Sequence, residues 1–201
     1  MRVGFFGGTF DPPHRGHRAV ACAAAKAFDL ERVLLAPTAV QPLKPETPEA
    51  SFEDRLRMAG LLCEGEKELE PSDLDGPRED GKRNYTIDTL RRLRSTLPDT
   101  AELFIIVGAD SFLTLRQWRD PEALLEIAQW IVVSRPQSFL SSWDDLALTS
   151  GQRARVHVLE GLQEPASATT VRARLHAGED CAELLPSSIL NYIRAHHLYG
   201  T

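Results

Sequence analysis

The feature that most constrains the fold is a series of short apolar runs that alternate with helix-forming stretches. The strongest run covers residues 103–107, five apolar residues that end at Gly108. A strand that is apolar on both faces is typical of a parallel sheet covered by helices on two sides. Strands are expected at residues 2–6, 32–36, 103–107, 130–133 and 156–159. The pattern predicts an α/β fold: a Rossmann-like, open, mainly parallel sheet of five to six strands with helices on both faces.

Helical patterns are expected between and after these strands. They cover residues 16–27, 51–63, 86–96, 170–177 and 187–197. We expect a single domain over residues 1–201, with an α/β core in 1–160 and a small C-terminal helical part in 161–201. The segment 71–84 is polar and rich in charge and glycine, so it is expected to be the most mobile internal stretch.

The overall charge narrows the classes of ligand. The 201 residues carry a net charge of −6, whereas proteins that bind nucleic acid usually present a basic face. We expect no nucleic-acid partner, and an anionic ligand must be held by local cations. No apolar stretch approaches the roughly 18 residues that a membrane helix needs, and no export signal precedes the first strand. A cytoplasmic protein is expected, in which Cys22, Cys63 and Cys181 are buried thiols.

The turn after the first expected strand indicates a phosphate site. It reads Gly7-Gly8-Thr9-Phe10-Asp11-Pro12-Pro13-His14-Arg15-Gly16-His17. It contains neither the dinucleotide fingerprint G-x-G-x-x-G nor the phosphate loop G-x-x-x-x-G-K-[ST]. Glycines let backbone N–H groups approach a phosphate, and a helix N-terminus adds partial positive charge. His14 and His17 share one face of that helix start and can both donate hydrogen bonds to phosphate oxygens.

Plainer interpretations of these residues exist. The two glycines could form only a tight turn, and the two histidines could be surface or capping residues. A zinc site at His14 and His17 is disfavoured because no Cys, Asp or Glu at ligand-like spacing completes it. We interpret Asp11 as a residue that shapes the turn. Asp110 could be a helix N-cap, a role that is compatible with a contact to a ligand.

The string from Gly7 to His17 resembles the signature G-G-T-F-D-P-x-H-x-G-H of the bacterial nicotinate-nucleotide adenylyltransferases, members of the H-x-G-H nucleotidyltransferase superfamily. The segment from Ser167 to Arg172 resembles the family's second phosphate signature, I-S-S-T-x-I-R, although Ala166 and Ala168 replace its first isoleucine and second serine. Segments in the middle of the chain are also similar, namely Tyr85-Thr86-Ile87-Asp88-Thr89-Leu90, Gly108-Ala109-Asp110, Trp118 and Arg135-Pro136. These segments resemble the pyridine-nucleotide branch rather than the phosphopantetheine, FMN or glycerol-phosphate branches.

The resemblance implies transfer of the adenylyl group of ATP to nicotinate mononucleotide, which gives nicotinate adenine dinucleotide and pyrophosphate during NAD synthesis. It implies Mg²⁺ that bridges the phosphates and is held mainly by phosphate and water. The implied catalytic residues are His14, His17 and Arg172. The implied ATP-binding residues are Gly7, Gly8, Thr9, Phe10, His14, His17, Gly108, Asp110, Ser167, Thr169 and Arg172.

The resemblance also implies residues that bind the acceptor. Lys44 and Arg135 would hold its phosphate, Trp118 would stack on its pyridine ring, and Tyr85 with Thr86 would contact its carboxylate. Taken alone, such a tryptophan is more often part of the core and such a lysine is usually solvated. Two alternative functions stay open: the same chemistry on nicotinamide mononucleotide or phosphopantetheine, and a non-catalytic nucleotide-sensing module. The sequence also leaves homo-oligomerisation open.

Overall fold

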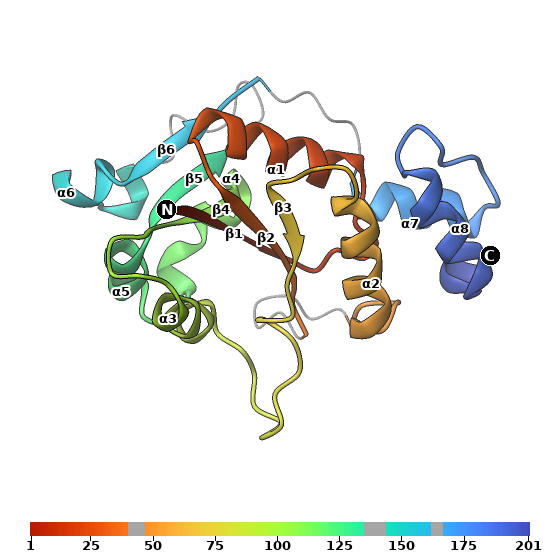
Figure 1. Ribbon diagram of the computed structural model, residues 1–201, viewed down its shortest axis with the longest axis horizontal. Helices are drawn as coiled ribbons and strands as arrows, with labels where there is room; N and C mark the ends of the chain where they lie inside the picture. The colour runs from red at the N-terminus through yellow and green to blue at the C-terminus, as the bar shows by residue number, and fades with distance from the viewer. Residues whose placement is uncertain (40–46, 135–143, 162–166) are drawn as a thin grey trace.

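Within the described residues, six parallel strands form one sheet at the centre of the protein (Figure 1). The computed structural model describes residues 1–39, 47–134, 144–161 and 167–201. The strands are β1 (Arg2–Gly8), β2 (Arg32–Pro37), β3 (Leu69–Pro71), β4 (Glu102–Gly108), β5 (Gln129–Val133) and β6 (Val156–Leu159). Their order is β3-β2-β1-β4-β5-β6, and every neighbouring pair is parallel. The predicted Rossmann-like sheet is confirmed.

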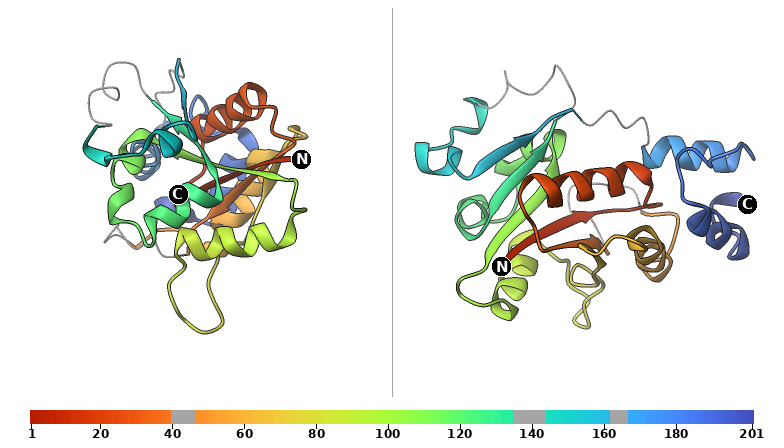
Figure 2. Two further views of the ribbon diagram at one scale, coloured as in Figure 1. Left: turned by 90° about the vertical axis from the view of Figure 1, so that its left-hand side faces the viewer. Right: turned by 45° about the horizontal axis from the view of Figure 1, so that its top comes forward.

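Helices cover both faces of this sheet (Figures 1 and 2). Their bounds are α1 (Arg15–Ala27), α2 (Phe52–Cys63), α3 (Thr86–Thr96), α4 (Ala109–Leu113), α5 (Pro121–Ile127), α6 (Ser150–Arg153), α7 (Ala168–His176) and α8 (Ser187–Ala195), with 3₁₀ turns at Leu115–Gln117, Asp144–Leu146 and Leu198–Gly200. Buried side chains of α1, α2, α7 and α8 share one hydrophobic core, and those of α3, α4 and α5 share the other.

The apolar run in β4 shows why the central strands lack a polar face. Phe104 and Ile106 belong to the core on one side of the sheet, whereas Leu103, Ile105 and Val107 belong to the core on the other side. Successive side chains of a strand point to opposite faces, so a strand covered on both sides must be apolar at every position. This explains why the central strands could be predicted from their unbroken apolar runs alone.

Several short elements were missing from the predicted pattern, among them β3, α5 and α6. Strand β3 has three residues, lies at the edge of the sheet and includes Glu70 and Pro71, so it carries no recognisable strand period. Helix α5 has seven residues and begins at Pro121, after Asp120 in a left-handed conformation. Such elements are too short for their periodicity to be distinguished from that of a loop.

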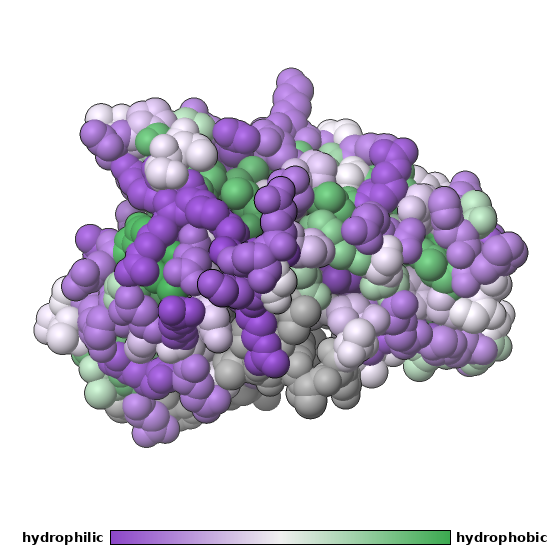
Figure 3. Space-filling model, turned by 90° about the horizontal axis from the view of Figure 1, so that it is seen from below, coloured by the Kyte–Doolittle hydropathy of each residue, from purple (hydrophilic) through white to green (hydrophobic). Residues whose placement is uncertain are grey.

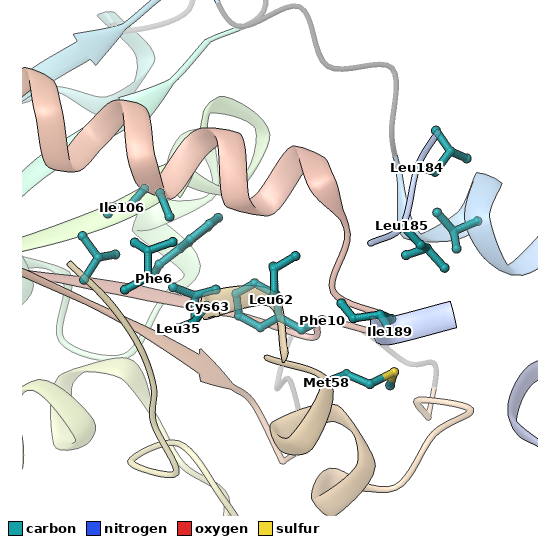
Figure 4. Packing of buried hydrophobic residues seen from close by; sticks show 14 of the residues in the cluster. Phe6, Phe10, Leu35, Met58, Leu62, Cys63, Ile106, Leu184, Leu185 and Ile189 are labelled. Carbon is teal, nitrogen blue, oxygen red and sulfur yellow. The ribbon is translucent and has the colours of Figure 1, made fainter. Parts of the chain in front are cut away.

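The C-terminal helices pack against the start of α1 and against α2 (Figures 1 and 2). Leu184, Leu185 and Ile189 lie in the same buried cluster as Phe10 and Met58 (Figure 4). The Arg15 N–H donates to the Leu184 carbonyl at 2.9 Å, and the Tyr192 hydroxyl donates to Asp54 Oδ1 at 2.9 Å. Residues from the end of the chain therefore complete the core beneath the N-terminal turn. The division of the chain near residue 160 stays a prediction.

The segment between β3 and α3 contains no helix or strand and extends from the sheet as a long loop (Figure 1). Asp75 is buried, with its carboxylate accepting from the Thr89 hydroxyl at 2.8 Å and its carbonyl from the Ala39 N–H at 2.9 Å. A Cβ at Gly76 would lie 2.7 Å from the Phe52 ring, so glycine is required there. On this side of the molecule hydrophilic residues predominate, with hydrophobic ones in the recesses between them (Figure 3). The mobility of the loop stays a prediction.

The cysteines differ in burial. Cys63 and Cys181 are buried and Cys22 is half-buried, so the prediction of three buried thiols is wrong for Cys22. Burial raises the pKa of the Cys63 thiol to about 12. A separate observation concerns length: none of the helices in the described ranges is both long enough and apolar enough to cross a bilayer.

Candidate active site

The N-terminal turn joins β1 to α1 and holds two stacked imidazoles. The His14 N–H donates to Nδ1 of His17 at 3.2 Å, and the two ring centres lie 3.7 Å apart. The Phe10 ring packs edge-on against His17 with a centre distance of 4.7 Å. Phe10 itself adopts a left-handed backbone conformation, with φ at 49°. The turn is therefore a fixed structure in which both histidines are oriented by their neighbours.

Burial sets the charge of these histidines. It lowers the pKa of His14 from its ordinary value of 6.5 to about 4. It also lowers the pKa of His17 well below 6.5, and the neighbouring His14 adds to that effect. Nδ1 of His14 is buried and has no hydrogen-bond partner among the described residues. At neutral pH both rings are therefore uncharged and can act as N–H donors.

Asp11 anchors the turn to two distant parts of the chain. Its carboxylate accepts from the Glu49 N–H at 2.8 Å, from the Ala50 N–H at 3.2 Å and from the Tyr199 hydroxyl at 2.7 Å. Burial raises the pKa of Tyr199, and the nearby Asp11 carboxylate raises it further. The Tyr199 hydroxyl therefore keeps its proton and donates a hydrogen bond to Asp11. All three bonds are structural, which agrees with the interpretation of Asp11 as a residue that shapes the turn.

Arg172 on α7 reaches the same turn. Its Nη1 donates to the Asp11 carbonyl at 2.7 Å, and its Nε lies 3.0 Å from Oε1 of Glu49. The other oxygen of Glu49 lies 2.8 Å from Nε2 of His176. The segments that carry the two sequence signatures therefore meet, although Arg172 and Asp11 are 161 residues apart in sequence.

The start of α7 is organised by Ser167. Its hydroxyl accepts from the Thr170 N–H at 3.1 Å and lies 2.8 Å from the Thr170 hydroxyl. This serine caps the helix, so the helix begins at Ala168 rather than at the predicted residue 170. Thr169 is exposed beside it.

Arg55 was not predicted as a site residue, yet its side chain holds the N-terminal turn in place by hydrogen bonds. Its buried guanidinium donates to the carbonyls of Thr9 at 2.6 Å, of Thr38 at 2.8 Å and of Ala50 at 3.2 Å. Burial lowers the pKa of this group, and the nearby Asp11 carboxylate partly opposes that shift. A signal was present: Arg55 shares the buried face of α2 with Met58 and Leu62, at positions i, i+3 and i+7.

A cavity of about 640 Å³ lies beside the turn, at the carboxyl ends of β1 and β4. In the sheet, the chain runs outward from β1 to β3 in one direction and from β4 to β6 in the other, so the strand order reverses between β1 and β4. Parallel α/β sheets usually bind their ligands at this reversal. From the predicted ATP set the cavity is lined by Gly7, Gly8 and Asp110, and from the predicted acceptor set by Tyr85, Thr86 and Trp118. The structure thus brings parts of both sets to one cavity.

Other predicted residues do not line this cavity. Among the described residues that were predicted to bind ATP or the acceptor, those that do not line the cavity are Thr9, Phe10, His14, His17, Gly108, Ser167, Thr169 and Arg172. Lys44 and Arg135 lie outside the described residues. Gly108 rather than Asp110 occupies the N-cap of α4, so the N-cap interpretation of Asp110 is wrong, and Asp110 is an exposed residue of the first turn.

Aromatic side chains form part of the cavity wall. The Trp118 indole N–H donates to the Thr114 hydroxyl at 3.1 Å, and its ring packs edge-on against Trp130 at 6.0 Å. These contacts hold the Trp118 ring in place while it stays only partly buried. The Arg119 guanidinium lies 4.5 Å from the centre of the Tyr85 ring. Arg119 also lines the cavity, although it was absent from the predicted set.

A glycine turn, a helix start with paired imidazoles and a cavity at the strand-order reversal together define a nucleotide-binding α/β protein. The Cytidylyltransferase-like family matches residues 5–174. A protein of Citrifermentans bemidjiense named "Probable nicotinate-nucleotide adenylyltransferase" is 36% identical over 99% of this chain and 98% of its own length. A protein of Solibacter usitatus with the same name is 37% identical, and the match covers all of both chains.

The chain belongs to the nicotinate-nucleotide adenylyltransferase family, whose members are nucleotidyltransferases. The resemblance inferred from the motifs is therefore confirmed. A solved structure, the Plasmodium falciparum nicotinic acid mononucleotide adenylyltransferase complexed with NaAD, is similar in fold, with a TM-score of 0.74 over 98% of this chain and 97% of that one. Its sequence identity is 16%, so that likeness concerns the fold.

Proposed function

We propose that the protein transfers the adenylyl group of ATP to nicotinate mononucleotide, giving nicotinate adenine dinucleotide and pyrophosphate. One observation carries the proposal. The cavity at the ends of β1 and β4 is lined both by Gly7, Gly8 and Asp110 and by the aromatic residues Tyr85 and Trp118. It can therefore hold a nucleotide and an aromatic acceptor next to each other.

The proposed chemistry needs no activated nucleophile. A phosphate monoester has a second pKa near 6, so the acceptor is already largely a dianion at neutral pH. Catalysis then consists of aligning two polyanions for in-line attack at the α-phosphorus and of stabilising the charge of the departing pyrophosphate. Fixed N–H donors and cations perform this task, which agrees with the neutral, oriented imidazoles of the turn.

On the nucleotide side, His14 and His17 donate to the phosphates of ATP, with His17 nearer the α-phosphate. Arg172 binds the departing β- and γ-phosphates. The backbone of Gly7, Gly8, Thr9 and Phe10 supplies further donors, and Ser167 with Thr169 does so at the start of α7. Gly108 and Asp110 contact the ribose. The contact between Arg172 and the Asp11 carbonyl supports this assignment, because it brings a cation to the histidine turn.

On the acceptor side, the Trp118 ring stacks on the pyridine, and Tyr85 with Thr86 lies near its carboxylate. Lys44 and Arg135 bind the acceptor phosphate in this proposal; both belong to segments outside the described residues. The fixed orientation of Trp118 supports the stacking role, because a ring already held by Thr114 and Trp130 loses little freedom on binding.

Mg²⁺ enters in this proposal as part of MgATP, held by phosphate oxygens and water. Among the described residues no group of three or more His, Cys, Asp or Glu side chains could hold a metal ion. A cytoplasmic location and homo-oligomerisation stay predictions, which cell fractionation and analytical ultracentrifugation test.

The test is a panel of acceptors with ATP and Mg²⁺, read by pyrophosphate release. We expect the highest kcat/KM with nicotinate mononucleotide. A faster reaction with nicotinamide mononucleotide or phosphopantetheine would replace the acceptor but keep the chemistry. Binding of ATP without pyrophosphate release with any acceptor would favour a nucleotide sensor.

A further inference from the structure

The charges around the cavity are unevenly distributed. Of the described residues that line it, Arg119 is the only cation, and Asp75 and Asp110 are the acids. Asp75 is already bonded to Thr89, and Asp110 is exposed in the first turn of α4. A positive group therefore marks the aromatic side of the cavity, where the acceptor ring is proposed to bind.

Arg119 stands at the edge of the ring-binding wall. It follows Trp118 directly, and its guanidinium lies 4.5 Å from the centre of the Tyr85 ring. Its ion pair with Asp88 is long at 3.9 Å, and its side chain is 58% exposed. An exposed ion pair of this length contributes little, so the guanidinium is free to take a stronger partner.

We propose that Arg119 is a specificity-determining residue that binds the carboxylate of the pyridine ring and so favours the acid over the amide. This inference rests on the proposed function and deepens it. A guanidinium matches the two oxygens of a carboxylate with two parallel N–H donors. A carboxamide offers one oxygen and no charge, and its NH₂ group would face the cation. Stacking on Tyr85 orients the guanidinium before the acceptor arrives.

The experiment compares kcat/KM for nicotinate mononucleotide and for nicotinamide mononucleotide in four proteins. These are the wild type, Arg119→Gln, Arg119→Lys and the control Arg91→Gln. Arg91 is an equally exposed arginine on α3 that pairs with Asp120 and does not line the cavity. We expect Arg119→Gln to lower the acid-to-amide ratio roughly tenfold to a hundredfold through the KM of the acid, as for loss of a charge-assisted hydrogen bond. Arg119→Lys should lower it less, and the control should keep it.

Two results would overturn the inference. An unchanged ratio in Arg119→Gln would show that the side chain does not contact the ring substituent. Equal losses with both acceptors would show that it binds a group common to both, such as the phosphate. A different failure, no transfer to either acceptor by the wild type, would contradict the proposed function instead, so the two outcomes can be distinguished.

Discussion

The two sides of the candidate site are built in different ways. On the phosphate side, the turn that carries His14 is held by residues from both ends of the chain: Asp11 contacts Glu49 and Tyr199, and Arg172 contacts the Asp11 carbonyl. On the acceptor side, the hydrogen bond of the Trp118 indole goes to a hydroxyl four residues earlier. Ring contacts also occur there, Trp118 with Trp130 and Arg119 with Tyr85.

This difference follows from what each side has to do in the proposed reaction. Charge that develops during phosphoryl transfer is stabilised only by donors already in position, and long-range hydrogen bonds between buried groups hold such donors rigidly. An aromatic ring is recognised by contact area and by a few polar contacts, which a partly exposed aromatic wall can supply. We therefore expect changes on the phosphate side to affect turnover and folding, and changes on the acceptor side to affect binding.

The largest expected effect is the loss of turnover when Arg172 or His17 is replaced. Arg172→Ala or His17→Ala should lower turnover at least roughly a hundredfold, because each removes a donor to the phosphates in the transition state. Pyrophosphate release measures it, and circular dichroism verifies folding. Arg174→Ala is the control, since Arg174 lies on the same helix but pairs with Glu183. Near-normal turnover in Arg172→Ala would show that this guanidinium does not act on the phosphates.

The second prediction concerns the anchoring of the turn. Asp11→Asn should lower the free energy of unfolding by about 2 kcal/mol, because an amide NH₂ cannot accept the hydrogen bonds that a carboxylate oxygen accepts. Urea denaturation measures the change. Asp29→Asn is the control, since the Asp29 side chain is 90% exposed. Equal midpoints for the two variants would show that the phosphate side does not depend on this network.

The third prediction uses pH. The pKa of His14 is lowered from 6.5 to about 4 by burial, so the unfolded chain binds this proton at a higher pH than the folded one does. Stability should therefore fall by about 2 kcal/mol between pH 7 and pH 5 and continue to fall toward pH 4. His14→Asn should remove that part of the dependence. Parallel denaturation curves at pH 7 and pH 5 test it, and the same slope in both proteins would count against a buried neutral His14.

The smallest expected effect lies on the acceptor side. Trp118→Ala should raise the KM for nicotinate mononucleotide roughly tenfold, as for loss of one stacking contact, and should leave the KM for ATP nearly unchanged. Trp118→Phe should give an intermediate value. Steady-state kinetics with each substrate varied in turn provides both constants. A larger change for ATP than for the acceptor would show that the two sides are not separable.

Local signals in the sequence were sufficient for the central strands and for several helix boundaries. Helix α3 begins at Thr86 and ends at Thr96, as its apolar spacing predicts. The burial of Arg55 could have been predicted, because its spacing to Met58 places it on the buried face of α2. Its contacts with the carbonyls of Thr9 and Thr38 could not be predicted, since they depend on where β1 and β2 end in space.

By itself the sequence determined the elements and their order, because apolar periodicity, glycine turns and helix caps act over a few neighbouring residues. It also predicted which residue types near Gly7 and Ser167 suit a phosphate. Only the tertiary structure decided that Arg172 and Tyr199 meet Asp11, and that Arg119 lines the cavity beside Trp118. Such contacts form after the helices pack on the sheet, so they depend on the buried surfaces of the whole chain rather than on any local propensity.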